Sequence, residues 1–511
     1  MATKRRPLFK KILIANRGEI AVRVLRACRE LGIPSVAVYS EADRASLHVQ
    51  LADEAVCIGP PPATESYLDM DKIVEAARST GAEAIHPGYG FLAENPAFAK
   101  RLEEEKLVFI GPNSRALDLV GDKIRARQTM EKAGIPIIPG MKRVPRDIFE
   151  CEAEARQIGF PVMIKASAGG GGKGMRIVSS EEELRPALEA GMREAKAAFG
   201  DESVYLEKCI EDPRHVEFQV LADNDGHVVH LFERECSIQR RHQKIVEETP
   251  STALDPELRQ KMGETAKKVL KVAGYNNAGT VEFLLDKDKN FYFLEVNARL
   301  QVEHPVTELT TGVDLVHQQI RIAAGEKLGL EQEKLSQRGH AIECRIYAED
   351  PANNFLPSSG KILYLKEPKG PGVRHDCGIY SGWEVPIYYD PILAKLIVWA
   401  ETRELACERM RCALEDYVIL GIHTTVRFLR DVISHPSFRK GETTTGFIKK
   451  YFDGWKDEAA DMDSLRLALT AAAFHEFNRS QAGAAARAAG PVKEVYSPWR
   501  SLGRWRIGGK S

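Results

Sequence analysis

A run of five glycines and one lysine, Gly169-Gly-Gly-Gly-Lys173-Gly174, follows the apolar segment 160–165 and precedes the segment 175–178. Residues without a Cβ let backbone N–H groups approach phosphate oxygens closely, and the lysine adds positive charge. Both flanking segments have strand character and no Lys-Ser or Lys-Thr pair follows, so the run is not a Walker loop. It predicts a phosphate-binding lid that opens and closes, with a glycine-rich surface hairpin as the alternative.

Two predicted strands, residues 280–285 and 291–297, carry side chains that are suited to a metal ion. Residues i and i+2 share a strand face, so Glu295 and Asn297 point the same way, and Glu282 lies beside them on the neighbouring strand. Carboxylates among apolar residues are costly to bury unpaired, and Mg²⁺ takes one or two carboxylates together with phosphates and water. The hairpin therefore predicts a site for Mg²⁺ or Mn²⁺, with an exposed polar strand face as the alternative.

A third motif, residues 239–244, reads Gln-Arg-Arg-His-Gln-Lys and holds three cations and a histidine. A solvated basic patch is the plain alternative. Beside a glycine lid and a metal site, the cluster instead predicts a clamp for anionic reactants.

The composition is that of a globular enzyme. Hydrophobic residues make up 43% of the 511 residues, and 72 basic against 73 acidic side chains give a net charge of -1, so neither nucleic acid nor an anionic membrane is an expected partner. The apolar runs fall far short of the roughly 18 residues that suggest a membrane span, and the basic N-terminus has no signal-peptide pattern. Nine cysteines without a Cys-x-x-Cys pair are expected to be reduced, so we expect a cytoplasmic protein.

The chain opens with strand, helix and strand patterns at residues 12–15, 19–31 and 35–39, which predict a βαβ start to a parallel sheet. The first loop holds one glycine, Gly18, where a dinucleotide-binding unit needs three, so a nicotinamide enzyme is disfavoured. The fold class is α/β, and the length favours several lobes. We expect an N-terminal parallel-sheet domain at 1–121, a core at 122–330 with a mobile glycine-rich lid at about 138–210, a C-terminal α+β part at 331–452 and a short helical and extended tail at 453–511.

The last of these parts changes in character. Residues 459–490 are rich in alanine, which predicts a helix followed by a tether, and Trp499 and Trp505 lie in a polar tail with no core of its own. Such tryptophans indicate a docking segment for a partner, or they fold back onto the chain's own surface.

From about residue 9 to about residue 452, the sequence resembles the biotin carboxylase family. The segments that carry the resemblance are 14–21 (Ile-Ala-Asn-Arg-Gly-Glu-Ile-Ala), 86–92 (His-Pro-Gly-Tyr-Gly-Phe-Leu), 165–175, 239–244, 295–304 (Glu-Val-Asn-Ala-Arg-Leu-Gln-Val-Glu-His) and 343–345 (Glu-Cys-Arg). So many separated motifs in one order make coincidence a poor explanation. The resemblance implies an ATP-grasp core behind a pre-ATP-grasp N-terminal domain, and a homodimer.

The resemblance also implies the roles of individual residues. ATP would be bound by Lys123, Lys165, Gly170, Gly171, Gly172, Glu207, Lys208, Ile210, His215, Gln239 and His242. The metal would be held by Glu282, Glu295 and Asn297, and bicarbonate by Lys244, Arg299, Gln301, the Val302 backbone and Glu303. The catalytic residues would be Glu303 as the base, Arg345 facing the biotin ureido oxygen, Lys244 and Arg299.

These side-chain types suit the carboxylation of biotin. Bicarbonate is a weak nucleophile, and the carboxylate of Glu303 takes its proton as it attacks the γ-phosphate of ATP. The resulting carboxyphosphate gives CO₂ and a phosphate that deprotonates biotin, whose enolate-like form needs a fixed cation at Arg345. A structural ion pair with Glu343, which shares the strand face of Arg345, is the alternative for this arginine.

A biotin-carrying domain of this family has an Ala-Met-Lys-Met motif, and the only Met-Lys pair here is Met141-Lys142. We therefore expect a separate biotin carboxyl carrier protein and carboxyltransferase subunits as partners. Residues 499–507 resemble the start of the segment that continues toward those domains in acyl-CoA carboxylase α chains. The expected protein is the biotin carboxylase subunit of an acyl-CoA carboxylase, of acetyl- or propionyl-CoA type.

Three alternatives stay open at this point. The first is the ATP-grasp subunit of a split pyruvate carboxylase, which differs only in the final acceptor. The second is another ATP-grasp carboxylate–amine ligase, which would not be expected to carry residues 239–244 and 301–304 together. The third is a regulatory subunit with a decayed site, which is disfavoured because each position that the chemistry needs carries a competent side chain.

Overall fold

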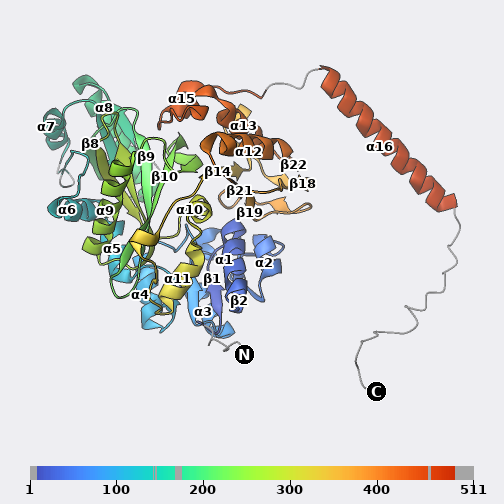
Figure 1. Cartoon of the computed structure of the whole chain (residues 1–511), viewed down its shortest axis with the longest axis horizontal. Coiled ribbons are helices and arrows are strands. Elements are labelled where there is room, and N and C mark those ends of the chain that lie inside the picture. Colours follow the sequence, from blue (N-terminus) through green and yellow to red (C-terminus); the bar gives the residue numbers. More distant parts are fainter. Residues whose placement is uncertain are drawn as a thin grey trace. The chain divides into compact units, whose positions relative to one another are not determined.

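The computed structural model describes residues 8–141, 143, 145, 147–166, 175–457 and 462–488. These residues belong to two compact units, with the boundary between residues 455 and 456. The first unit contains the parallel sheet, a long antiparallel sheet and a small three-stranded lobe (Figure 1).

A five-stranded parallel sheet with the order β3-β2-β1-β4-β5 forms the N-terminal part. Its strands are β1 (Ile12–Ile14), β2 (Ser35–Tyr39), β3 (Glu54–Cys57), β4 (Ala84–His86) and β5 (Val108–Phe109), and its helices are α1 (Gly18–Glu30), α2 (Leu47–Leu51), α3 (Met70–Thr80), α4 (Pro96–Glu104) and α5 (Ser114–Gly121). All three residues of the central strand β1 are buried, as expected for a parallel strand covered on both faces. The predicted βαβ start is confirmed, because α1 connects β1 to its parallel neighbour β2.

An eight-stranded sheet with the order β13-β12-β9-β10-β11-β14-β21-β19 carries the polar motifs. Its strands are β9 (Arg214–Ala222), β10 (Val228–Arg240), β11 (Gln243–Thr249), β12 (Asn277–Leu285), β13 (Phe291–Asn297), β14 (His340–Tyr347), β19 (Val373–Cys377) and β21 (Ile392–Ala400). Its neighbouring strands are antiparallel throughout. The sheet therefore continues from the predicted core into the predicted C-terminal part through the pairing of β11 with β14, and the boundaries at residues 121 and 330 stay a prediction.

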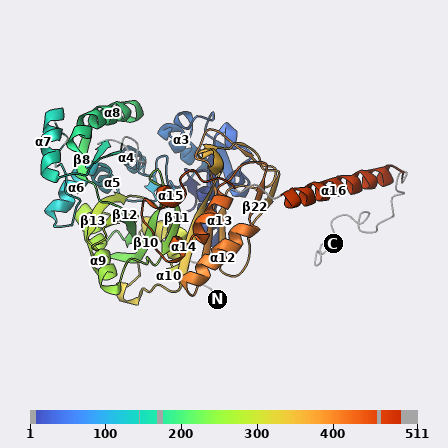
Figure 2. The same cartoon turned by 90° about the horizontal axis from the view of Figure 1, so that it is seen from above.

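A three-stranded sheet, β7-β6-β8, forms a small lobe with helices α7 and α8, which lie together at one end of the unit in Figure 2. The bounds are β6 (Val162–Ala166), β7 (Arg176–Val178), β8 (Val204–Lys208), α7 (Ile148–Ile158) and α8 (Glu181–Phe199). Strands β6 and β7 are antiparallel, which confirms the two strands predicted on either side of the glycine run. The lobe has its own apolar core, which includes Ile164, Val178 and Leu188. The glycine run itself, with Gly170, Gly171 and Gly172, lies outside the described residues.

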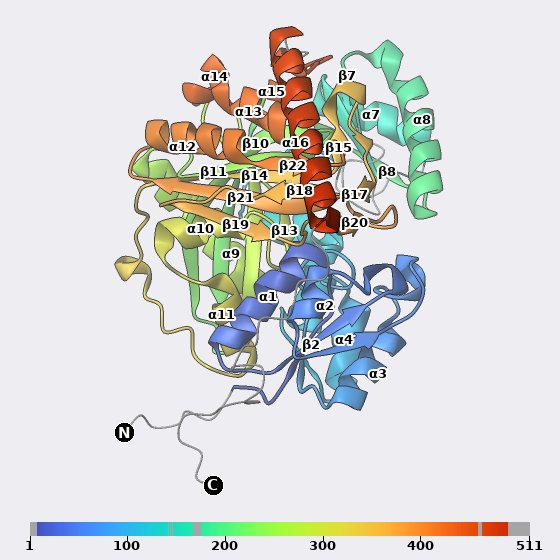
Figure 3. The same ribbon diagram turned by 90° about the vertical axis from the view of Figure 1, so that its right-hand side faces the viewer.

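Helices cover the eight-stranded sheet and complete the first unit. They are α6 (Lys123–Lys132), α9 (Pro256–Ala273), α10 (His304–Thr311), α11 (Leu315–Ala323), α12 (Arg403–Asp416), α13 (Val426–Ser434), α14 (Pro436–Arg439) and α15 (Phe447–Tyr451). Short strands are β15 (Glu349–Asp350), β16 (Leu356–Pro357), β17 (Gly360–Lys361), β18 (Tyr364–Lys366), β20 (Glu384–Val385) and β22 (Val418–Leu420). Figure 3 shows β21, β14, β11 and β10 as successive strands, with α12 packed near β21.

In the second unit, helix α16 (Met462–Ala488) confirms the helix that the alanine-rich segment predicts. Trp499 and Trp505 lie outside the described residues. No helix in the described part of the chain combines the length and the apolar character that crossing a membrane requires.

Candidate active site

Lys244, near the start of β11, lies at the centre of a cluster of buried carboxylates. Its ammonium donates to Glu282 Oε1 at 2.7 Å, to Glu303 Oε1 at 2.7 Å and to Glu217. Burial alone would lower the pKa of Lys244, but the three carboxylates outweigh it and raise that pKa well above its usual value. Arg234, which is fully buried, donates from Nε to Glu217 Oε1 at 2.6 Å and balances part of the negative charge. Lys244 is therefore a fixed cation in a crowded anionic setting.

Glu303 precedes α10 and lies between two cations. Its Oε2 accepts a hydrogen bond from Arg345 Nη2 at 3.0 Å, while its Oε1 accepts the one from Lys244. Burial raises the pKa of Glu303, but the charges of Lys244 and Arg345 outweigh burial, so the pKa is lowered well below its usual value. Glu303 is thus held as an anion with a permanent guanidinium charge beside it.

The guanidinium of Arg345 connects two carboxylates on different elements. Its Nε donates to Glu247 Oε1 on β11 at 2.6 Å, in addition to the bond from Nη2 to Glu303. Among the described residues, its ion pairs are with these two groups, so the alternative pair with Glu343 is not made. Burial raises the pKa of Glu247 to about 7, and burial also raises the pKa of Glu343 well above its usual value.

The two predicted metal-binding strands are paired as expected. Glu282 of β12 lies opposite Glu295 of β13, and Asn297 Nδ2 donates to Glu282 Oε1 at 2.7 Å. His215 Nε2 lies 2.9 Å from Glu282 Oε2 on the other side. Burial would raise the pKa of Glu282, but Lys244 and His215 hold it well below its usual value. The predicted proximity of Glu282, Glu295 and Asn297 is confirmed, and their role as metal ligands stays a prediction.

Carboxylate and amide oxygens from these strands fit a hard divalent cation. Mg²⁺ prefers such oxygen ligands, and it is held by one or two carboxylates with phosphate and water completing its shell. Glu295 is partly exposed and faces Lys123 of α6, with 3.2 Å between Oε2 and Nζ. The Glu295 oxygens therefore stand at the accessible side of the cluster, where a cation bound to a polyphosphate would approach.

Three residues that were predicted to bind bicarbonate lie in the segment directly after β13. Arg299 donates from Nη1 to Gln301 Oε1 at 3.1 Å and from Nη2 to Asn297 Oδ1 at 3.2 Å. Gln301 is buried and reaches Glu282 Oε1 at 3.4 Å through Nε2. The carbonyl of Val302 accepts a hydrogen bond at 2.8 Å from Lys395 Nζ on β21. Arg299 and Gln301 thus lie in one chain of hydrogen bonds that reaches Glu282, and Val302 is anchored directly after them.

Predicted nucleotide residues lie on both sides of this cluster. On β8 of the small lobe, Glu207 pairs with Lys165 of β6 and with Arg127 of α6. His242 lies at the turn between β10 and β11. Burial lowers the pKa of His242, and the positive charge of nearby Lys165 lowers it further. Lysines whose counter-ions are carboxylates can exchange those partners for phosphate oxygens.

The remaining predicted nucleotide residues make contacts of other kinds. Gln239 Nε2 of β10 lies 2.7 Å from His215 Nδ1 of β9, and this contact links the two strands. The ammonium of Lys208 donates to the carbonyls of Gly159 and Phe160 at 2.9 and 2.8 Å, so its side chain supports β6. Any contact of residue 208 with a nucleotide would therefore involve its backbone, as for Ile210.

Two cations of the predicted clamp at residues 239–244 have partners away from the carboxylate cluster. Arg240 donates to Glu349 Oε2 at 2.8 Å, and Arg241 donates to Asn354 Oδ1 at 2.8 Å. Both partners belong to the C-terminal part, so these arginines support the turn between β10 and β11. Lys244 alone of the three joins the carboxylate cluster, because the chain reverses direction before it.

Several residues of the site escaped the sequence analysis. They are Glu94, Glu217, Arg234, Glu247 and Lys395. The available signal was an ionisable residue inside an otherwise apolar strand, such as Arg234 within β10 or Lys395 within β21, since such residues need a buried partner. Glu94 gave no such signal, because it lies in a loop and reaches Arg299 over a sequence distance of 205 residues.

Three protein families match successive parts of the chain. Residues 8–117 match "Biotin carboxylase, N-terminal domain", residues 122–331 match "Carbamoyl-phosphate synthase L chain, ATP binding domain", and residues 343–450 match "Biotin carboxylase C-terminal domain". The matches are in the order that the sequence motifs predict.

Named relatives cover most of the chain. A pyruvate carboxylase subunit of Methanothermobacter thermautotrophicus is 54% identical over 88% of this chain and 91% of its own length, and biotin carboxylase 1 of Bacillus subtilis is 53% identical over 87% and 99%. The mitochondrial methylcrotonoyl-CoA carboxylase alpha subunit of Dictyostelium discoideum is 49% identical over 97% of this chain and 70% of its own length.

A solved structure has the same fold. The biotin carboxylase domain dimer of the Hydrogenobacter thermophilus 2-oxoglutarate carboxylase, in complex with MgADP, ADP and bicarbonate, aligns with a TM-score of 0.85 and 50% identity over 88% of this chain and 99% of that chain.

The fold, the lysine–carboxylate cluster and the small three-stranded lobe define an enzyme of the ATP-grasp type. Within this class, the chain is more than 50% identical to relatives whose length it covers almost completely. The chain belongs to the biotin carboxylase family.

Proposed function

We propose that this enzyme uses ATP and bicarbonate to carboxylate biotin on a separate carrier protein, as the first half-reaction of an acyl-CoA carboxylase. The observation that carries the proposal is the position of Glu303 between Lys244 and Arg345, at 2.7 and 3.0 Å. A buried carboxylate between two cations combines a proton acceptor with charges that stabilise anions on either side.

Bicarbonate would enter beside Lys244 and Arg299, which attract its negative charge, with Gln301 and the Val302 backbone fixing its orientation. In the substrate-free chain the pKa of Glu303 is held low by cation contacts. An anion that draws Lys244 away from Glu303 weakens one of those contacts and raises the proton affinity of this carboxylate. Glu303 then accepts the bicarbonate proton at Oε1 or Oε2 as the bicarbonate oxygen attacks the γ-phosphate and ADP leaves.

Nucleotide binding is assigned to the residues that flank the cluster. Lys123 and Lys165 would leave Glu295 and Glu207 for phosphate oxygens, and Gly170, Gly171 and Gly172 would supply backbone N–H groups. Glu207, Lys208, Ile210, His215, Gln239 and His242 would line the remainder of the site. Glu282, Glu295 and Asn297 would hold Mg²⁺ or Mn²⁺, which offsets the charge of the phosphates during transfer.

Arg345 would serve the second step. Carboxyphosphate breaks its C–O bond to give CO₂ and phosphate, the phosphate takes the proton from the biotin ureido nitrogen, and that nitrogen attacks CO₂. The negative charge that develops on the ureido oxygen needs a fixed cation, and arginine keeps its charge at every relevant pH. The partner Glu247 holds the guanidinium in place during this step.

The acyl-CoA context is supported by how far the similarity extends. The match to the methylcrotonoyl-CoA carboxylase relative covers 97% of this chain and thus enters the tail, whereas the match to the pyruvate carboxylase relative covers 88%. Residues 453–511 would then dock a carboxyltransferase subunit. The ATP-grasp component of a split pyruvate carboxylase remains the second candidate, favoured by the 54% identity of that relative.

The carrier and the assembly are further parts of the proposal. A biotin carboxyl carrier protein on a separate chain is supported by the biotin carboxylase of Bacillus subtilis, whose length this chain matches over 99%. A homodimer is supported by the dimer of the structural relative from Hydrogenobacter thermophilus.

The test measures bicarbonate-dependent ADP release with and without free biotin. Wild type should be stimulated by biotin, and Glu303→Gln should lose this stimulation, because an amide cannot accept the proton. Glu75→Gln, at an exposed position of α3, is the matched control and should behave as wild type. If the rate of ATP hydrolysis depends on neither bicarbonate nor biotin and is unchanged in Glu303→Gln, the proposed carboxylation is wrong, and another ATP-grasp ligase activity becomes the better explanation.

A further inference from the structure

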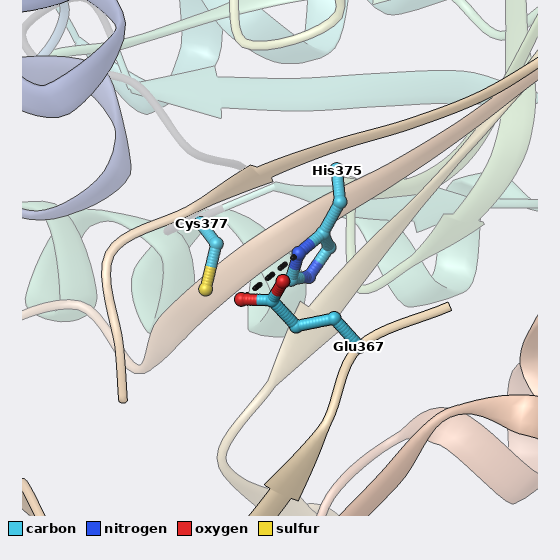
Figure 4. A group of neighbouring side chains, drawn as sticks. All are labelled: Glu367, His375 and Cys377. Carbon is cyan, nitrogen blue, oxygen red and sulfur yellow. Dashed lines mark ion pairs between the residues drawn. The ribbon is translucent and has the colours of Figure 1, made fainter. Parts of the chain in front are cut away.

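A second group of ligand-bearing side chains lies outside the candidate active site, between β18 and β19. Glu367 follows the last residue of β18, while His375 and Cys377 are two residues apart on β19. Figure 4 shows the Glu367 carboxylate between the His375 ring and the Cys377 sulfur, with the three groups turned toward one another. One ligand atom from each lies within 4.8 Å of the others, and His375 Nδ1 is 3.9 Å from a Glu367 oxygen.

The far side of the His375 ring is already fixed. Its Nε2 lies 2.7 Å from the hydroxyl of Tyr417, just after α12, and the two rings meet edge to face at 5.1 Å. With Nε2 occupied in this way, Nδ1 is the ring nitrogen that faces Glu367 and Cys377. A ligating histidine almost always makes such a hydrogen bond through its other nitrogen, which sets its tautomer and orientation.

Cys377 is buried, and its sulfur has one backbone donor. The sulfur is buried, and the N–H of Ile379 donates to Sγ at 3.4 Å. An N–H donor beside sulfur stabilises a thiolate. The thiol also donates to the Ile379 carbonyl at 3.4 Å, a contact that exists only while the sulfur is protonated.

We propose that Glu367, His375 and Cys377 bind a zinc ion, with water in the fourth position. Thiolate, imidazole and carboxylate are all zinc ligands, and a thiolate disfavours Mg²⁺, the cation expected at the oxygen ligands of the active site. The chain therefore carries a hard-cation site on β12 and β13 and a separate soft-cation site on β19. This inference does not depend on the proposed carboxylation.

The geometry needs only a small contraction. Bond lengths of about 2.0 to 2.3 Å in a tetrahedron put neighbouring ligand atoms about 3.3 to 3.6 Å apart. The atoms here lie within 4.8 Å of one another. Rotation of the Glu367 side chain, which is 38% exposed, can shorten its distances to the other two ligands, and rotation of Cys377 about χ1 would bring Sγ toward His375 Nδ1. The same exposure gives the ion a path from solvent and leaves one side for water.

Zinc binding replaces the S–H bond of Cys377 with an S–Zn bond and releases one proton to solvent. Burial raises the pKa of this thiol to about 12 in the metal-free chain, so binding competes with protonation. Arg26 and Lys369 add positive charge near His375, and the carboxylates of Glu367 and Asp376 oppose it. The two negative charges that Glu367 and Cys377 place in direct contact with the ion offset the more distant repulsion from these two cations.

The experiment titrates the full-length chain with Co²⁺, which reports zinc sites through its visible spectrum, and then displaces it with Zn²⁺. A sulfur-to-cobalt charge-transfer band with tetrahedral d–d bands is expected, and stoichiometric Zn²⁺ should remove both. Cys377→Ser should abolish the charge-transfer band. His375→Gln and Glu367→Gln, which keep the thiol, should each weaken Co²⁺ binding at least about tenfold, and Tyr417→Phe should weaken it by about tenfold.

A second thiol requires its own control. Cys236 lies with Glu217 and Glu303 in the candidate active site, and Cys57 and Cys412 are exposed. The band should persist in Cys236→Ser and in the Cys57→Ser/Cys412→Ser double variant, each checked for folding by circular dichroism. A band that survives Cys377→Ser, that is lost in Cys236→Ser, or that never forms in folded wild type overturns the proposal.

Discussion

At the residue scale, one planar guanidinium connects two buried carboxylates of the candidate active site. Arg345 donates from two different nitrogens to two carboxylates, Glu247 at 2.6 Å and Glu303 at 3.0 Å. Lysine has the same charge but presents it at one point, so it cannot replace a fork that spans two acceptors. This makes Arg345 a place where charge and geometry can be separated by experiment.

We expect Arg345→Lys to lower biotin-stimulated ADP release about 10- to 100-fold, which corresponds to the loss of one charge-assisted hydrogen bond of about 1.5 to 3 kcal/mol. Bicarbonate-dependent turnover without biotin should fall less, because Glu303 and Lys244 remain. The measurement is the ratio of the two rates in wild type and variant.

Arg241→Lys is the matched control, since Arg241 contacts Asn354 at the surface and should tolerate the change. Equal losses with and without biotin in Arg345→Lys would contradict the assignment of Arg345 to the biotin step. They would indicate that this arginine acts only by holding Glu303.

Contacts between side chains on neighbouring strands could be predicted from the alternation of strand faces. Contacts between residues far apart in the sequence could not. Glu282, Glu295 and Asn297 follow from two neighbouring strands and their shared face, and they lie together as expected. Lys395 reaches Val302 over a sequence distance of 93 residues, and nothing local to β21 indicates which partner it has. The partners of Arg240 and Arg241 could not be predicted either, because a tight turn with positive φ at Arg241 and His242 separates these arginines from Lys244.

At the element scale, Glu248 ties three elements together through one buried carboxylate. It belongs to β11 and accepts hydrogen bonds from His340 of β14 at 2.8 Å and from Arg403 at the start of α12 at 2.7 Å. Burial would raise the pKa of Glu248, but His340 and Arg403 outweigh it and lower the pKa to about 2. Such a group stabilises the fold above its unfolded pKa and loses that contribution as the pH falls through the folded value.

We expect Glu248→Gln to lower the urea midpoint at pH 7 and to flatten its fall between about pH 5 and pH 2. A pKa lowered from 4.5 to about 2 corresponds to about 3 kcal/mol of stability above pH 5, where the unfolded chain is also ionised. The measurement is the urea midpoint of both proteins across this range. Glu401→Gln, exposed just before α12, is the control, and a parallel acid profile in Glu248→Gln would refute the argument.

Local patterns predicted elements better than they predicted how sheets join. The βαβ start, the strands around the glycines, the hairpin of β12 and β13 and the alanine-rich helix are all present, since each rests on periodicity within one segment. The pairing of β11 with β14 could not be predicted, because the sequence distance between them is large and both are simply buried strands. That pairing makes one sheet from two predicted parts.

At the scale of the whole molecule, the chain divides into two compact units between residues 455 and 456. Every described residue of the candidate active site precedes this boundary. Trp455 is the last anchor of the first unit, because its Nε1 donates to Asp431 Oδ2 at 3.0 Å and its ring meets Phe428 at 5.5 Å.

We therefore expect a chain that ends at Trp455 to keep the thermal midpoint and the biotin-stimulated ADP release of the full chain. Ending the chain at Phe452 instead removes Trp455, and the loss of its partly buried ring should cost about 2 kcal/mol and lower the midpoint by several degrees. The two truncations differ by three residues, so they separate the anchor from the tail.

The truncation at Trp455 also tests the docking role proposed for residues 453–511. Within the second unit, Leu467, Leu469 and Phe474 on α16 are not covered by other described residues of that unit, and apolar side chains of this kind can contact a partner. The chain that ends at Trp455 should carboxylate free biotin normally and fail to co-purify with its cognate carboxyltransferase, whereas the full chain should do both. If the truncated chain still co-assembles, the docking surface lies in the first unit, and if it loses free-biotin turnover while remaining folded, the tail serves catalysis rather than assembly.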